Sequence, residues 1–386
     1  MKTLGLILEL NPFHNGHEYF IKQAIEKVNP DVTIAIISSN FAMRGEPMVM
    51  DKWEKSKFCL SYGIDIVLEL PFLGSVSSAD YFCYNSIKTL TDFQITDLAF
   101  GVELENIDKI VQMKNILNNN EFNNLVKKYL SLGNSYSTSN LKALKEFTDD
   151  QEIIDNFSLP NNTLAIGYLK SLDKLNKNIN INLIKRIKNN YYDEDITDNK
   201  INSATSIRNL LSKNEDISNY VPIPGYVYHN PDVMNKNILS LLRYVFSVKD
   251  IQEIENTLGM NEGIENRILS FIYKSDSYED LITNIQTKRY SLNKIRRLLL
   301  HTLLNITKEH ENKYHYYHRI LSMNNKGKKF VSSLPNHVKE VILTTFKNQN
   351  NYLVDIELKA SKLYGLLINQ PNIYLNEFNV PYIGEK

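Results

Sequence analysis

Four short apolar runs separated by helical patterns dominate the first hundred residues. The runs cover residues 3–10, 32–38, 65–70 and 96–102, and each has the length of a single strand. Strands that are largely apolar and alternate with helices are typical of a parallel sheet that helices cover on both faces. Because crossovers between parallel strands are right-handed, this pattern predicts a doubly wound α/β fold.

The rest of the chain divides into a mixed middle part and a mostly helical end. The segment at residues 221–225 holds two prolines and a glycine, which neither a helix nor a central strand accommodates. We therefore expect a Rossmann-like domain over residues 1–220 and a mostly α-helical domain over residues 226–386. Helices are predicted at residues 17–28, 52–62, 79–90, 105–132, 139–147, 161–175, 203–213, 233–246, 250–258, 263–273, 277–285, 291–307, 337–347 and 355–369, and a fifth strand at 179–187.

The sharpest chemical signal is the segment NPFHNGH at residues 11–17, which follows the first predicted strand and opens the first predicted helix. His14 and His17 are three residues apart, so both can face one ligand there. A helix N-terminus at the carboxyl edge of a sheet favours an anion such as phosphate. The alternative is a pair of surface histidines at a helix cap. A zinc site is less well supported, because no H-E-x-x-H motif and no nearby cysteine completes a ligand set.

A second polar segment, SATSIR at residues 203–208, opens another predicted helix. Its hydroxyls can cap the helix or donate to phosphate oxygens, and the planar guanidinium of Arg208 suits a polyphosphate. The alternative is an ordinary helix cap with an exposed arginine. The residues concerned are Ser203, Thr205, Ser206 and Arg208. Neither a P-loop nor the glycine fingerprint of dinucleotide-binding domains occurs in the chain.

Together the two segments resemble the HIGH-type nucleotidylyltransferase superfamily, in which two histidines act at the α-phosphate and a later serine- and threonine-rich motif binds the outer phosphates. The resemblance extends further, to the bacterial tRNA(Met) cytidine acetate ligases. The matching segments are residues 5–17, Arg44-Gly45-Glu46-Pro47, Lys52-Trp53, residues 66–71, Phe100-Gly101, Pro160-Asn161-Asn162, Arg186 with Tyr191-Tyr192-Asp193, Lys288-Arg289-Tyr290 and residues 295–301.

The resemblance implies a ligase that activates acetate with ATP and then acetylates the wobble cytidine of elongator tRNA(Met). It implies that His14 and His17 are catalytic. A polyphosphate is commonly bound together with Mg²⁺, so Mg²⁺ is a plausible cofactor, although no carboxylate is identified as a metal ligand. The implied ATP contacts are Ile7, Leu8, Glu9, Leu10, Asn11, Pro12, Phe13, His14, Asn15, Gly16, His17, Glu18, Tyr19, Phe20, Gly101, Asn162 and Arg186, with Ser203, Thr205, Ser206 and Arg208 at the outer phosphates.

The net charge of the whole chain is zero, with 44 basic and 44 acidic residues, but the charge is distributed unevenly. Residues 286–329 hold eleven lysines and arginines against two glutamates, together with four histidines and four tyrosines. Such a segment suits RNA phosphates and unpaired bases, although a solvated helix face is the usual alternative. The residues predicted to contact tRNA are Lys288, Arg289, Lys294, Arg296 and Arg297.

The composition indicates where the protein is located and which other classes of function stay open. No apolar run is long enough to cross a membrane, and Cys59 and Cys83 lack metal-site spacing, so we expect free thiols and a cytoplasmic location. Two other functions stay open: an adenylyltransferase that makes a small-molecule adenylate, and an RNA-binding protein that has lost catalysis. The basic segment argues against the first, and the presence of both His14 and His17 argues against the second.

Overall fold

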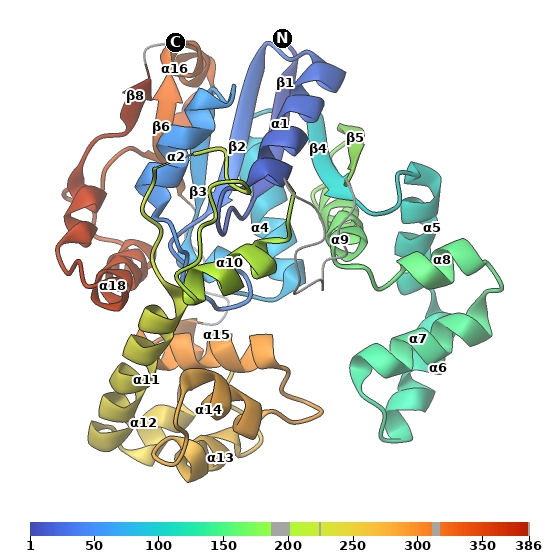
Figure 1. Ribbon diagram of the computed structural model, residues 1–386. Coiled ribbons are helices and arrows are strands. Elements are labelled where there is room, and N and C mark those ends of the chain that lie inside the picture. Colours follow the sequence, from blue (N-terminus) through green and yellow to red (C-terminus); the bar gives the residue numbers. More distant parts are fainter. Residues whose placement is uncertain (187–200, 224, 311–316, 385–386) are drawn as a thin grey trace.

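The computed structural model describes residues 1–186, 201–223, 225–310 and 317–384, and a mostly parallel sheet lies at its centre (Figure 1). The strand order is β5-β4-β1-β2-β3-β6-β7, and β8 also pairs with β6. Strands β1 to β5 run parallel to one another, with Leu6 of β1 opposite Ala35 of β2. The predicted parallel α/β fold is therefore confirmed. The strands are β1 (Thr3–Leu8), β2 (Val32–Ser38), β3 (Ile66–Leu70), β4 (Asp97–Val102), β5 (Asn180–Lys185), β6 (His318–Asn324), β7 (Ile342–Leu343) and β8 (Tyr382–Gly384).

Alternate residues of each strand pack against helices on opposite faces of the sheet. Ala35 and Ile37 of β2 belong to the core on the side of α1 (Asn15–Val28) and α2 (Lys52–Ser61). Ile34 and Ile36 belong to the core on the side of α4 (Ala79–Asp92) and α9 (Pro160–Lys174). Burial on both faces explains why the strands are apolar throughout.

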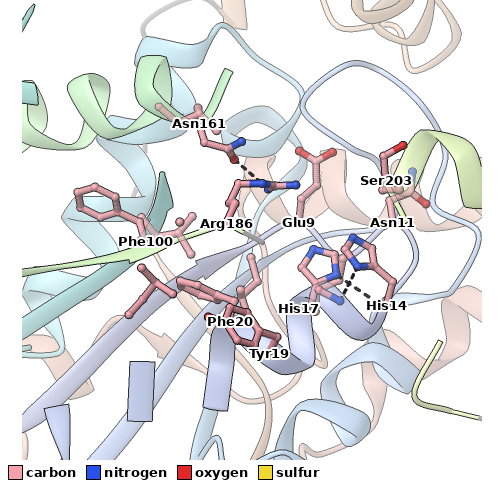
Figure 2. Close-up of a pocket in the computed structure, with 18 of the residues that line it drawn as sticks. Glu9, Asn11, His14, His17, Tyr19, Phe20, Phe100, Asn161, Arg186 and Ser203 are labelled. Atoms are coloured by element: carbon pink, nitrogen blue, oxygen red, sulfur yellow. Dashed lines mark hydrogen bonds between the residues drawn. The ribbon is translucent and has the colours of Figure 1, made fainter. Parts of the chain in front are cut away.

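The chain changes faces after β3, since α1 and α2 connect the first three strands on one face and α4 leads to β4 on the other. Strand β4 then lies beside β1, so the strand order reverses between these two strands. Ligands of open α/β sheets bind at such a switch point, beyond the carboxyl ends of the strands. Glu9 and Phe100 lie at this edge (Figure 2).

Two groups of helices extend from the sheet layer (Figure 1). The first lies between β4 and α9 and comprises α5 (Ile107–Leu117), α6 (Asn120–Ser131), α7 (Tyr136–Phe147) and α8 (Gln151–Asn156). The predicted single helix at 105–132 is interrupted because the Asn119 side chain accepts from the Glu121 N–H and caps α6. The second group comprises α11 (Pro231–Val248), α12 (Ile251–Glu255), α13 (Ile264–Phe271), α14 (Tyr278–Ile285) and α15 (Leu292–Leu303).

The C-terminal part of the chain does not stay with the second group of helices but returns to the sheet. Strand β6 pairs antiparallel with β3 and is buried at every residue. The structure thus differs from the predicted division into residues 1–220 and 226–386, because a segment near residue 320 completes the N-terminal sheet. The predicted helix at 337–347 is also wrong beyond Lys339, where α17 (Asn336–Lys339) ends and the chain enters β7.

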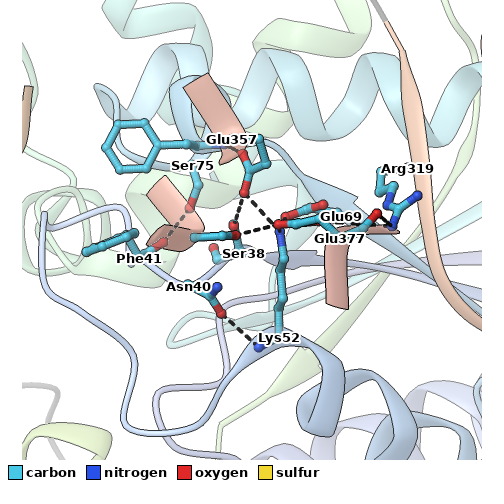
Figure 3. A network of polar contacts seen from close by, with 12 residues as sticks. Ser38, Asn40, Phe41, Lys52, Glu69, Ser75, Arg319, Glu357 and Glu377 are labelled. Atoms are coloured by element: carbon cyan, nitrogen blue, oxygen red, sulfur yellow. Dashed lines mark hydrogen bonds and ion pairs between the residues drawn. The ribbon is translucent and has the colours of Figure 1, made fainter. Parts of the chain in front are cut away.

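A buried cluster of charged side chains joins the C-terminal part of the chain to the sheet (Figure 3). Lys52 of α2 forms ion pairs with Glu69 of β3, with Glu357 of α18 (Tyr352–Leu367) at 3.0 Å and with Glu377 at 2.6 Å. These four side chains are at most 1% exposed. Burial, together with the adjacent Glu357, raises the pKa of Glu69 well above its usual value. Arg319 of β6 adds a second cation, with its Nη2 atom 4.0 Å from the Glu377 carboxylate.

Three short helices and two 3₁₀ helices complete the described part of the fold. They are α3 (Phe72–Ser75), α10 (Ala204–Ser212), α16 (Asn325–Ser333) and the 3₁₀ helices η1 (Lys308–His310) and η2 (Ile373–Phe378). Within the described ranges, no helix combines the length and apolarity needed to cross a bilayer.

Candidate active site

A cavity of about 220 Å³ lies at the switch point and brings together the two polar segments found in the sequence (Figure 2). It opens between β1 and β4 and is bounded by the N-terminal turns of α1, α9 and α10. The predicted residues that line it are Ile7, Leu8, Glu9, Leu10, Asn11, His14, Gly16, His17, Tyr19, Phe20, Gly101, Arg186, Ser203, Thr205 and Arg208.

Six of the predicted ATP contacts do not line the cavity, namely Pro12, Phe13, Asn15, Glu18, Asn162 and Ser206. Asn162 is fully buried, and its side-chain oxygen accepts from the backbone N–H groups of Glu103 and Leu104 at 3.1 and 3.2 Å. The preceding residue, Asn161, lines the cavity instead and accepts a hydrogen bond from Arg186 at 3.2 Å. Neighbouring positions on a helix differ by about 100° in direction, and sequence alone does not say which asparagine faces inward.

Sequence reasoning missed further lining residues. These are Arg44, Phe82, Phe100, Asn161, Leu164, Tyr168, Ile184, Lys185, Ile201, Asn202 and Ala204. Arg44, Phe100 and Asn161 stood in segments that resemble the ligase family, which was the available signal. Phe82, Leu164 and Tyr168 gave no signal in the sequence, because their helical spacing is that of ordinary core residues.

His14 and His17 hold each other in place at the start of α1. The Nδ1 atom of His14 accepts from the Gly16 N–H at 3.0 Å, and Nδ1 of His17 accepts from the His14 N–H at 3.3 Å. The two rings lie 3.8 Å apart, centre to centre. Since each Nδ1 is an acceptor, the neutral rings carry their proton on Nε2 and can donate it to a ligand. Gly16 is required, because a Cβ atom there would lie 2.8 Å from the His14 ring.

Both histidines are neutral at pH 7. Burial lowers the pKa of His14 well below 6.5, and the neighbouring His17 and Arg186 lower it further. Burial, with a contribution from Arg186, lowers the pKa of His17 to about 3. The site therefore offers neutral hydrogen-bond donors beside the positive end of the α1 dipole.

The second polar segment reaches the same cavity through α10. Ser203 caps this helix by accepting from the Ser206 N–H at 3.0 Å. Arg208 donates to the Asn11 carbonyl at 2.8 Å and pairs with Glu46 at 3.1 Å, so its guanidinium is fixed at the cavity wall. Leu10, just before Asn11, has a left-handed backbone with a φ of 61°, which is uncommon outside glycine. Two helix N-termini and an arginine thus converge on one space, an arrangement suited to a polyphosphate.

Glu9 is the carboxylate that follows β1 directly into the cavity (Figure 2). Burial raises its pKa, while Arg44 acts in the opposite direction. No cluster of three or more histidine, cysteine or acidic side chains suited to a metal ion occurs in the described part of the chain. Mg²⁺ bound with a polyphosphate commonly uses only one or two protein carboxylates, so Glu9 fits this role.

Comparison with known proteins agrees with this geometry. Residues 1–378 match the model of the HIGH Nucleotidyl Transferase family. The tRNA(Met) cytidine acetate ligase of Staphylococcus aureus (strain MRSA252) is 33% identical, with 100% of both chains covered. That of Clostridium kluyveri (strain NBRC 12016) is 36% identical, covering 98% of this chain and 97% of the relative. The chain belongs to the tRNA(Met) cytidine acetate ligase family of HIGH nucleotidyl transferases.

Solved structures of Thermotoga maritima TmcAL share the ligase fold over their whole length. The apo crystal structure superposes with a TM-score of 0.88 at 27% identity, and 100% of each chain is covered. The structure bound with alpha-thio ATP gives a TM-score of 0.84, again with 100% of each chain covered.

The five basic residues predicted to contact tRNA occupy two different environments in this ligase. Arg289 has a side chain that is 75% exposed and pairs with Glu262, and Lys288 is also exposed and donates to the Gly133 carbonyl at 3.2 Å. Lys294 is partly exposed and lies 3.8 Å from the centre of the Tyr290 ring. These three remain candidates for tRNA contact.

Arg296 and Arg297 instead join α15 to the loop that follows β2. Arg296 is 13% exposed and forms ion pairs with Glu279 at 2.9 Å and Glu46 at 3.7 Å. Arg297 donates to the Met43 carbonyl at 3.3 Å. Gly45 packs so closely against this helix that a Cβ atom would lie 2.6 Å from the Arg297 nitrogen. In this arrangement both arginines already have partners within the protein.

The segment at 286–329 does not form one basic surface. His318 and Arg319 are buried in β6, at 1% and 2% exposure. Lys326, beyond the strand, pairs with Asp65 at 3.3 Å. Lys313, Tyr314, His315 and Tyr316 lie outside the described residues.

Proposed function

We propose that this protein activates acetate with ATP to form acetyl-adenylate and transfers the acetyl group to N4 of the wobble cytidine of elongator tRNA(Met). The observation that carries this proposal is the neutral pair His14 and His17 at the N-terminus of α1, inside the switch-point cavity. The family supplies the substrates, because its curated members are named for tRNA(Met), cytidine and acetate. The bound alpha-thio ATP of T. maritima TmcAL supports ATP as the nucleotide.

In the first step an acetate oxygen attacks the α-phosphorus of ATP and pyrophosphate leaves. Negative charge grows on the oxygens of the α-phosphate and on the leaving pyrophosphate. The Nε2–H groups of His14 and His17 would donate to the α-phosphate, and the neutral rings need no proton transfer to do so. Arg208 and the N-terminus of α10 would hold the outer phosphates.

In the second step the cytidine N4 attacks the acetyl carbonyl. A carbon–nitrogen bond forms, the bond from the carbonyl carbon to the phosphate oxygen breaks, AMP leaves and N4 loses one proton. The mixed anhydride is already activated, so positioning of the two reactants supplies much of the catalysis. Lys288, Arg289 and Lys294 are the proposed tRNA contacts, since their charges lie at the surface.

Two further parts of the proposal concern the metal and the location. Glu9 would provide the protein ligand for Mg²⁺, which when bound neutralises the charge of the polyphosphate. The proposed location is the cytoplasm, in keeping with Cys59 and Cys83, which are both free and buried.

Incubation with ATP and labelled acetate, with and without elongator tRNA(Met), tests this function. We expect acetate-dependent release of pyrophosphate, acetyl-adenylate in the absence of tRNA, and label on tRNA as N4-acetylcytidine at the wobble position. Acetyl-adenylate without any labelled tRNA would contradict the second step. Adenylation of a different small molecule, with no response to acetate, would favour the small-molecule adenylyltransferase.

A further inference from the structure

The switch-point cavity extends beyond the histidines to the opposite face of the sheet. Gly101 of β4 faces α1, where Phe20 and Arg186 are its neighbours, whereas Phe100 faces α4 and α9. On that second face the cavity is lined by Phe82 of α4, Phe100 of β4, and Leu164 and Tyr168 of α9. We call these four residues the apolar compartment. The phosphate-binding groups described above lie in the other part of the cavity.

Packing between α4 and α9 fixes the apolar compartment. Leu164 and Tyr168 are four residues apart and therefore share one face of α9. The Tyr168 and Phe100 rings lie 5.3 Å apart, centre to centre. Gly167 allows the helices to approach, because a Cβ atom there would lie 2.6 Å from the Cys83 sulfur. The walls of the compartment therefore have little room to move outward.

One polar group in the apolar compartment, the Tyr168 hydroxyl, has no hydrogen-bond partner among the described residues. Tyr168 is 5% exposed and lines the cavity, yet its hydroxyl makes no hydrogen bond within the part of the chain that the structure describes. The residue is buried while its hydroxyl opens into the cavity, so the hydroxyl can donate a hydrogen bond to a ligand that enters there. Burial, followed by Cys83 and Glu9, raises the pKa of Tyr168 well above 10, which keeps the hydroxyl a donor.

We propose that the apolar compartment is the acyl subsite, in which the acetate methyl packs against Phe82, Phe100 and Leu164 while the carboxylate accepts from Tyr168. The inference rests on the proposed function and adds the basis on which acetate is chosen over longer acids. A ligand with one methyl and one carboxylate matches three apolar walls and one donor. A ribose or phosphate would place polar oxygens against those walls. Arg44 also lines the cavity and offsets the charge of the nearby Glu9.

The choice of acid tests the proposal. Acid-dependent exchange between ATP and pyrophosphate is measured with acetate, propionate and butyrate, for the wild type and for Leu164→Ala. The wild type should prefer acetate, and the variant should lower the acetate-to-propionate ratio of kcat/KM at least about tenfold, as expected when a pocket gains room for one methylene. Leu172→Ala is the matched control, because Leu172 is buried on the same helix but does not line the cavity.

A second variant, Tyr168→Phe, keeps the shape of the compartment and removes only the donor. We expect the KM for acetate to rise about tenfold or more, which is the loss typical of a hydrogen bond to a charged group. The affinity for ATP, measured by direct titration without acid, should not change. This variant tests the proposal even if Leu164→Ala folds poorly.

Several results would overturn the acyl subsite. An unchanged acid preference in Leu164→Ala with an unchanged acetate KM in Tyr168→Phe would do so. A change confined to ATP affinity would place the nucleotide in the compartment, and a change confined to the transfer to tRNA would place the cytidine there. If the wild type itself shows no acetate-dependent exchange, the proposed function fails and this inference fails with it.

Discussion

His14 and His17 illustrate how a few backbone contacts determine the chemistry of a side chain. Each Nδ1 atom accepts a backbone hydrogen bond at the start of α1, which leaves Nε2–H as the donor. Burial keeps both rings neutral. A neutral donor already oriented toward developing charge requires no rearrangement during the reaction.

Replacing His14 by Asn should separate the two roles of this residue, which are to cap helix α1 and to donate a hydrogen bond from Nε2. Asparagine is a good N-cap, so α1 should keep its start and the protein its stability. The variant loses the Nε2 donor, and we expect acetate-dependent pyrophosphate exchange to fall roughly 10²- to 10³-fold. Circular dichroism and urea unfolding check the fold, and exchange near the wild-type rate would remove His14 from the mechanism.

The lowered histidine pKa values also predict how stability depends on pH. Unfolded histidine titrates near 6.5, whereas the pKa of His17 in the folded protein is about 3. Between these values the unfolded state binds more protons, so stability should fall as the pH decreases from about 6.5 toward 3. The urea midpoint should fall less steeply with pH in His17→Gln than in the wild type. The same substitution at exposed His337 is the control, and identical slopes in wild type and His17→Gln would contradict the prediction.

At the scale of elements, the cluster around Lys52 ties helices α2 and α18 to strand β3 (Figure 3). Glu357 adds a 2.6 Å hydrogen bond from the Phe72 N–H, which anchors the loop after β3. Arg319 of β6 donates to the Glu377 carbonyl at 3.1 Å. The cluster therefore holds α2 and β3, from the N-terminal part of the chain, against β6, α18 and η2, which lie more than 200 residues further along the sequence.

Removing Lys52 should destabilise the whole fold. In Lys52→Met the buried glutamates lose their central cation, and breaking such a buried pair costs roughly 3–5 kcal/mol. Lys57→Met on the same helix removes an exposed i,i+3 pair with Glu54 and should cost less than about 1 kcal/mol. Urea unfolding compares the two variants. Equal free energies of unfolding would show that the Lys52 cluster contributes no more than a surface pair.

The elements also show where sequence reasoning is reliable. Strands β1 to β4 and helix α1 could be predicted because their patterns are local: apolar runs, helical spacing and a motif at a helix start. Strand β6 could not be predicted, because its histidine, arginine, serine and asparagine are typical of an exposed polar segment. His318 lies 3.2 Å from Asp92, and Arg319 contacts Glu377, so partners far along the chain make its burial possible. The choice between Asn161 and Asn162 likewise depends on how α9 packs.

At the scale of the whole molecule, the excess of positive charge at 286–329 is divided among a surface, an interface and a buried strand. Arg296 and Arg297 join the α11–α15 helices to the loop at Met43–Glu46. Lys288 and Arg289 remain at the surface, where Lys288 contacts the turn after α6 and Arg289 pairs with Glu262. A count of charges along the sequence therefore overestimates the surface available for RNA.

Alanine variants of Arg289 and Arg296 should differ in which step of the reaction they impair, because Arg289 lies at the surface and Arg296 lies in an interface. Arg289→Ala should weaken acetyl transfer to tRNA severalfold, leave acetyl-adenylate formation unchanged, and reduce the salt slope of tRNA binding by about one. Arg296→Ala should impair both steps, since it leaves Glu46 without one of its two arginines beside the cavity. Loss of tRNA transfer alone in Arg296→Ala would instead make this residue a direct tRNA contact.

The most direct test of the central claim follows the oxygen atoms of acetate. If acetate attacks the α-phosphorus of ATP at the His14–His17 site and the cytidine amine then attacks the acetyl carbon, one acetate oxygen must remain with AMP. With acetate labelled by oxygen-18 in both carboxylate positions, mass spectrometry should find one labelled oxygen in each AMP released and the other in N4-acetylcytidine. Label in pyrophosphate or phosphate, or unlabelled AMP beside acetylated tRNA, would contradict an acetyl-adenylate intermediate.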